Sequence, residues 1–121
     1  MDTGLTSAGA EDLLAELAST YTYVQLHVGL PGASGAANVA DESTRLQVTW
    51  ASPSAGTLAS ASSLEWEDVA ADETFTHFSA WSAASDGTCG FTGTVIPTSV
   101  EAGDTFKISA GNVTASLLVV T

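Results

Sequence analysis

The stretch Tyr23-Val24-Gln25-Leu26-His27-Val28 alternates between two kinds of side chain. Its three aliphatic residues fall on one face of an extended chain and the other three fall on the opposite face, because successive side chains of a strand point in opposite directions. The alternation therefore predicts a β-strand that turns one apolar face towards a core.

Beyond this strand, short segments with strand character are separated by turn-forming residues. Leu30–Asn38 is built from Gly, Pro and small residues without apolar periodicity, which predicts a loop, and Pro53 and Gly56 break the chain again. Further strands are expected at 45–50, 58–66, 74–83, 89–96, 106–110 and 113–120.

Two turn signals predict how some of these strands pair. Asp86-Gly87 is a tight-turn dipeptide, so 74–83 is expected to form a hairpin with 89–96. Pro97 is expected to end this hairpin, because proline cannot donate a ladder hydrogen bond. Gly111-Asn112 predicts a second hairpin near the C-terminal end, between the last two expected strands.

Only residues 8–18 have a helical pattern. Their apolar residues recur at the spacing of three and four that forms one stripe on a helix, namely Ala10, Leu13, Leu14, Leu17 and Ala18. Glu11 and Asp12 are expected in the first turn, where carboxylates suit the helix dipole, and Thr6 or Ser7 as the N-terminal cap.

Together these segments predict a mainly β protein: an antiparallel β-sandwich, jelly-roll-like, with one short N-terminal α-helix. Six or seven short strands with turns at intervals of about ten residues are typical of sandwiches and barrels. The chain has no second composition zone, linker or internal repeat. We therefore expect a single domain over residues 1–121, with a helical segment at 1–20 and the sandwich at 21–121.

The charge of the chain excludes some classes of partner. It carries 14 acidic residues against two basic ones, Arg45 and Lys107, for a formal net charge of -12. Nucleic-acid backbones are bound by clustered Lys and Arg, so nucleic acid is not an expected partner. An anionic membrane surface would also repel the chain. With only 13% charged residues, the surface is suited to contact with other proteins.

No apolar stretch approaches the roughly 20 residues that a membrane span requires. The chain opens with Met1-Asp2-Thr3-Gly4, without the basic region and apolar core of a secretory signal, so assembly in the cytoplasm is expected.

The residue inventory offers little for catalysis. His27 and His77 are the only histidines, and neither lies in a recognisable catalytic motif. We therefore expect no enzymatic activity, no catalytic residue, no cofactor and no metal; a hydrolase that uses a carboxylate pair is a weaker alternative. His27 is expected to hold the corner before the Pro-Gly loop by bonding a loop carbonyl. Cys89 has no partner for a bridge, which predicts a small buried filler.

An acidic run could bind a divalent cation through oxygen ligands, but its spacing matches no known calcium loop. A solvated acidic edge that discourages strand pairing is the preferred interpretation. The run comprises Glu65, Glu67, Asp68, Asp72 and Glu73.

The aromatic residues suggest contacts with protein or sugar. Trp50 continues the inward face of its strand and is expected in the core. Trp66 and Trp81 lie next to acidic or Ser-rich stretches; packing in the core or a subunit contact is the preferred interpretation for them, and a glycan-stacking platform is less favoured. His77 is expected to share a strand face with Phe75 and Trp81, as a half-buried ring near a protein contact.

Four motifs in order along the chain resemble a known family. They are Val24–Val39, with its Leu-His and Pro-Gly-x-x-Gly elements; Arg45–Trp50, with Val-Thr-Trp; Thr76–Ala83, with Thr-His and Trp-Ser-Ala; and the closing Ala102–Phe106 with Ala110–Asn112. This pattern is similar to the small minor structural proteins, called minor tail or tail fibre proteins, of tailed phages that infect actinobacteria. Asn38 stands where that family usually has an acid.

The resemblance implies a virion component without enzymatic activity, either a minor tail or fibre protein or a capsid decoration protein. Its partners would be other virion structural proteins and copies of itself in a homo-oligomer. The alternative is a virion module that binds host-surface carbohydrate. No catalytic residue or ligand is carried over from the family.

Overall fold

A computed structural model describes residues 3–120 of the chain and is mainly β, with 39% strand and 12% helix. This confirms the predicted fold class. The elements follow the order α1 (Ser7–Thr20), β1 (Tyr23–His27), β2 (Leu46–Gln47), β3 (Thr57–Ala59), β4 (Leu64–Trp66), β5 (Glu73–Trp81), β6 (Cys89–Val100), β7 (Phe106–Ile108) and β8 (Thr114–Ser116).

One layer is an antiparallel sheet with the strand order β2-β1-β5-β6. The predicted strand at 23–28 forms β1. All of β1 pairs with β5, from Tyr23 opposite Trp81 to His27 opposite His77. β2 is shorter than predicted. Beyond it, Trp50 makes only an isolated bridge to Ser60.

The predicted hairpin of β5 and β6 is confirmed. Asp86 and Gly87 both adopt positive φ, 58° and 74°, as a tight turn of this kind requires. Pro97 does not end the hairpin, because β6 continues to Val100. The pairing with β5 shifts register between Phe75 and His77, so Pro97 lies at an irregularity of the ladder, where a missing N–H is tolerated.

The second layer is a long two-stranded ribbon in which residues 57–66 run antiparallel to 106–116. β3 pairs with β8 and β4 pairs with β7. Two predictions were wrong here: 58–66 is interrupted instead of forming one strand, and 106–110 does not form a hairpin with 113–120. Ser60 occupies the interruption, and its buried hydroxyl accepts the backbone N–H groups of Gly111 at 3.2 Å and Val113 at 3.4 Å.

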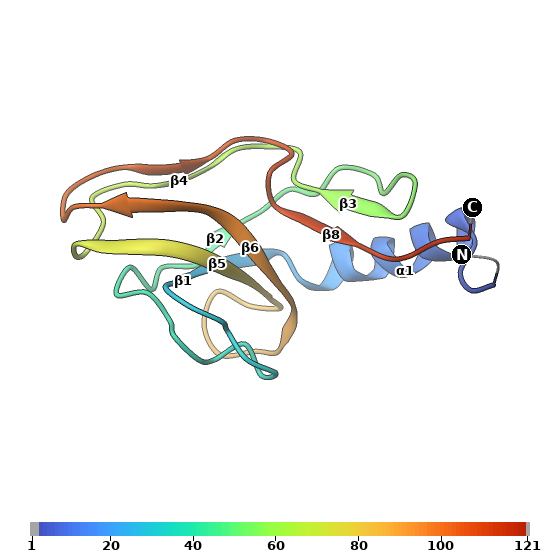
Figure 1. Ribbon diagram of the computed structural model, residues 1–121, viewed down its shortest axis with the longest axis horizontal. Helices are drawn as coiled ribbons and strands as arrows, with labels where there is room; N and C mark the ends of the chain where they lie inside the picture. Colours follow the sequence, from blue (N-terminus) through green and yellow to red (C-terminus); the bar gives the residue numbers. More distant parts are fainter. Residues whose placement is uncertain (1–2, 121) are drawn as a thin grey trace.

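The two layers close over one hydrophobic core, and Figure 1 shows the β4–β7 ribbon above the four-stranded sheet. Aromatic rings join the layers: the centroids of Phe75 and Phe106 are 4.8 Å apart. The main side chains of this core are Val24, Leu26, Val48, Leu64, Trp66, Val69, Phe75, Phe78, Val95, Val100, Phe106, Ile108 and Val113. A β-sandwich is therefore present; jelly-roll connectivity is compatible with it and stays a prediction.

Helix α1 extends from this body alongside β3 and β8 (Figure 1). Thr6 caps it as predicted, since its hydroxyl accepts the Gly9 N–H at 3.2 Å. Glu11 and Asp12 are not in the first turn, because the helix begins earlier than expected, at Ser7. The predicted stripe is only partly buried. Ala10 and Leu14 are fully covered, whereas Leu13 is 52% exposed.

We expect Leu14→Ala to lower the free energy of unfolding by about 2–5 kcal/mol, because it leaves a cavity between the helix and the ribbon. The matched variant Leu13→Ala should change stability by less than about 0.5 kcal/mol, since this side chain faces solvent. Guanidinium unfolding followed by circular dichroism measures both values. Equal losses would contradict this placement of α1.

Candidate functional site

Polar side chains gather on the face of the main sheet that points away from the core. Along β1, Val24 and Leu26 enter the core, whereas Gln25 and His27 point the other way and are nevertheless buried. Their cover is the 28–45 segment between β1 and β2, which lies below the sheet in Figure 1. The sheet is therefore buried on both faces here, which the alternation of β1 did not predict.

The cover is fixed by side chains that bond its backbone. Gln25 Nε2 donates to the Ser43 carbonyl at 3.2 Å. The Glu73 carboxylate, at the start of β5, accepts the N–H groups of both Asp41 and Glu42 at 2.9 Å. These bonds satisfy backbone groups that a loop at a sheet face would otherwise leave unpaired. The roles of Gln25 and Glu73 were not predicted, because a partner so distant in sequence leaves no local signal.

His27 is the centre of this polar layer. Its Nδ1 lies 2.8 Å from the Ala37 carbonyl, which confirms that the ring bonds a loop carbonyl and holds the corner. A carbonyl only accepts, so Nδ1 carries the proton and Nε2 is the acceptor of the neutral ring. The Ser79 hydroxyl, 2.6 Å from Nε2, therefore donates to it and in turn accepts the Trp81 indole N–H at 2.6 Å. In this hydrogen-bond chain from Trp81 through Ser79 and His27 to Ala37, every polar side-chain atom has a partner.

Burial lowers the pKa of His27, and the neighbouring His77 lowers it further, while the backbone at Ala37 and Asn38 opposes this shift. The neutral imidazole is thus the form that the fold favours. It is also the only form in which Nε2 can accept the Ser79 proton.

A serine hydroxyl bonded to a histidine has the composition of a nucleophile and its base. Here, however, Ser79 and His27 are both 0% exposed, and the Trp81 indole N–H occupies the remaining side of the serine hydroxyl. A substrate has no path to this oxygen without opening the fold. The geometry is that of a structural hydrogen-bond chain.

Arg45 and Trp81 close one end of the polar layer. The guanidinium carbon of Arg45 lies 4.0 Å from the centroid of the Trp81 ring, within cation–π distance. Arg45 Nη1 also donates to the carbonyls of Ala83 at 2.9 Å and Asp86 at 2.7 Å. The side chain thereby joins the start of β2 to the turn between β5 and β6.

Neither of the two tryptophans that were predicted as contact residues, Trp66 and Trp81, offers a free ring face. Trp66 is 2% exposed and its indole donates to the Thr44 carbonyl at 2.9 Å; Trp81 is 8% exposed beneath Arg45. A sugar needs an exposed aromatic face for stacking, so these residues provide no platform in this structure. Trp50 packs against the core, as expected.

His77 is half-buried on the polar face, opposite His27, and the Thr76 hydroxyl bonds its Nδ1 at 2.8 Å. Regular alternation predicted that His77 shares a strand face with Phe75, and this prediction was wrong. The register shift between the two residues sends Phe75 into the core.

Cys89 was predicted as a buried filler and is only half-buried. Its surroundings raise the pKa of its thiol, mainly by desolvation.

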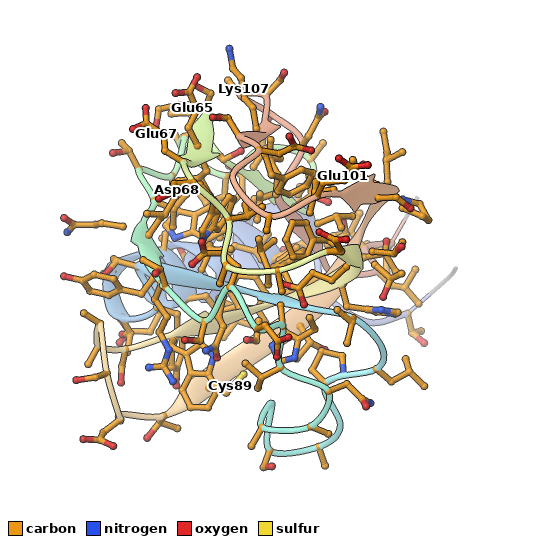
Figure 2. The ribbon with its side chains drawn as sticks, turned by 90° about the vertical axis from the view of Figure 1, so that its left-hand side faces the viewer. Glu65, Glu67, Asp68, Cys89, Glu101 and Lys107 are labelled. Carbon is orange, nitrogen blue, oxygen red and sulfur yellow. The ribbon has the colours of Figure 1, made fainter. Side chains whose placement is uncertain are left out.

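The acidic run does not act as one unit. Asp72 accepts the backbone N–H of Ala102, and Glu73 accepts those of the cover described above. The other three residues of the run are exposed, namely Glu65, Glu67 and Asp68. Figure 2 shows these three with Glu101 at one end of the molecule, where Lys107 lies next to Glu65, its cross-strand neighbour. No group of three or more metal-ligating side chains is found within residues 3–120.

A groove of about 890 Å³ opens between β5 and β6 on one side and β7 and its following turn on the other. Its apolar lining includes Val95, Phe106 and Ile108, and its polar lining includes Thr94 and His77. Of the three predicted contact residues, His77 is among the residues that line the groove, whereas Trp66 and Trp81 are not. In the described part of the chain, no helix is long and apolar enough to cross a membrane.

Comparison with known families identifies the class of protein. A family model described as "Podophage GP4 fiber I protein gp80" matches residues 15–116, which is most of the chain. The chain therefore belongs to this family of bacteriophage fibre proteins. This confirms the predicted phage structural class, whereas an actinobacterial host stays a prediction. No curated protein is similar enough to the chain to count as a match.

We expect Ser79→Ala to lower the free energy of unfolding by about 2–4 kcal/mol, because it leaves both the Trp81 indole N–H and His27 Nε2 buried without a partner. Ser99→Ala is the matched control on the same hairpin. This variant removes an exposed hydrogen bond between the hydroxyls of Ser99 and Thr74. It should lower the free energy of unfolding by less than about 0.5 kcal/mol. Denaturant unfolding followed by tryptophan fluorescence compares the two, and similar losses would contradict a buried chain at Ser79.

The lowered pKa of His27 predicts a pH dependence with a definite sign. In the unfolded state His27 binds a proton with the ordinary histidine pKa of about 6.5, and in the folded state with a lower pKa. The contribution of the neutral ring to stability is therefore complete above this value and falls as the pH drops towards the folded pKa. We expect His27→Gln to lose this component between about pH 5 and 7, above most carboxylate titration. His77→Gln should keep most of it. Unfolding curves at several pH values test this, and an unchanged slope in His27→Gln would contradict it.

Proposed function

We propose that the chain is a non-enzymatic structural component of a phage tail fibre, which acts by packing its sandwich against copies of itself and neighbouring virion proteins. The family match over residues 15–116 is the observation that carries this proposal. A tail position is favoured over capsid decoration because the family is described as a fibre protein.

The interior of the sandwich supports a structural role. Among residues 3–120, every buried side-chain nitrogen and oxygen has a hydrogen-bond partner within the protein. Active sites, in contrast, keep polar groups free to meet a substrate or a transition state. The one serine–histidine pair described above is sealed, so no reacting group is presented to a ligand there.

The surface supports a role in assembly. Only 13% of the residues are charged, and hydroxyl and small side chains take their place. Such groups lose little solvation free energy when another protein covers them, whereas charges lose much more. The net charge of -12 keeps the free chain from unspecific association before assembly in the host cytoplasm.

Purified virions provide the test. We expect mass spectrometry to find the chain in intact particles, and antibody labelling in the electron microscope to mark the tail. A virion that lacks the chain would overturn the structural role. Labelling of the capsid shell would overturn the fibre position and leave a virion role.

A further inference from the structure

β6 is the end strand of the main sheet, and its outer edge is open. β5 pairs with one side of it, and no described strand forms a ladder with the other. An open edge of twelve residues is long, and such an edge presents backbone N–H and C=O groups that can accept a second chain. Proteins usually protect such edges with charged side chains, yet Cys89–Val100 contains no charged residue.

The groove between β6 and β7 lies along this open edge. Its floor is apolar, formed in part by Val95, Phe106 and Ile108, each of which keeps only a small exposed fraction. None of the residues that line the groove is acidic, although the chain as a whole carries 14 acids. At the groove a second, equally acidic copy can therefore approach without bringing carboxylates together, and Lys107, one of the two basic residues, is part of the lining.

Ile96 makes the edge self-complementary. Its side chain is 79% exposed, and it borders the groove on the same strand. A protruding apolar side chain and an apolar groove on one surface are the requirement of an isologous interface, in which each copy gives and receives the same contact. An isologous interface has a two-fold axis, and this axis would pass close to Ile96.

We propose that two copies of this chain associate along their β6 edges about such a two-fold axis, with Ile96 of each copy packed against the other's groove floor. The proposal rests on the proposed assembly role and names the surface for it. Pro97 limits the contact, because it cannot donate a hydrogen bond and lies at the ladder irregularity. The contact uses the β6 edge of each copy, so an isologous interface of this kind is complete with two copies; the β2 edge on the other side of each sheet takes no part in it.

Sedimentation equilibrium of the purified chain at increasing concentration tests the proposal. We expect a reversible dimer. Ile96→Lys should raise the dimer dissociation constant by at least about tenfold, because it places a charge over an apolar floor. Ile96→Val should retain association. Thr94→Glu is a second variant at the exposed rim and should also weaken the dimer, by restoring repulsion between carboxylates.

Leu118→Lys is the matched control, because Leu118 is likewise apolar and 82% exposed but lies beyond β8, away from the groove. It should dimerise like the unchanged chain. A chain that is monomeric throughout, an Ile96→Lys variant that associates as well as the unchanged chain, or a dimer lost in Leu118→Lys would each overturn the proposal. A monomeric chain that is nevertheless found in virions contradicts the dimer alone; a dimeric chain absent from virions contradicts the fibre role alone.

Discussion

The structure depends on a buried hydrogen-bond chain that runs from Trp81 through Ser79 and His27 to the carbonyl of Ala37. An amphipathic sheet normally leaves one face to water. Here the outer face is polar and is covered by the 28–45 segment. Buried polar groups are tolerated only when each has a partner, so the position of the segment and the directions of these hydrogen bonds must agree.

This constraint explains why the long connection from β1 to β2 can be irregular and still ordered. Gln25, His27 and Glu73 fix its backbone from the sheet side, and Trp66 reaches it from the opposite layer through Thr44. The two layers and the cover are thereby joined by side-chain bonds as well as by the apolar core.

Local patterns in the sequence predicted the local structure well. The alternation at 23–28, the helical spacing of α1 with its Thr6 cap and the Asp86-Gly87 turn each depend on neighbours in sequence, and the strand, the helix and the turn are confirmed; the apolar stripe of α1 is buried only in part. The ribbon of β3–β8 and β4–β7 was mispredicted, because residues about 40 to 60 positions apart must meet and the Gly111-Asn112 signal indicated a local hairpin instead. The shift beside Thr76 was also invisible to a strict period of two.

The polar layer was predicted only at His27, whose position before a Pro-Gly loop suggested a bond to a loop carbonyl. Ser79 and Gln25 gave no signal, since a hydroxyl or an amide on an alternating strand is the usual mark of a solvent face. Long-range nitrogen–proton NMR spectra of the imidazoles test the central claim most directly. The account predicts that His27 is neutral at neutral pH, with its proton on Nδ1 and a hydrogen bond accepted at Nε2. A proton on Nε2, or a charged ring, would contradict it.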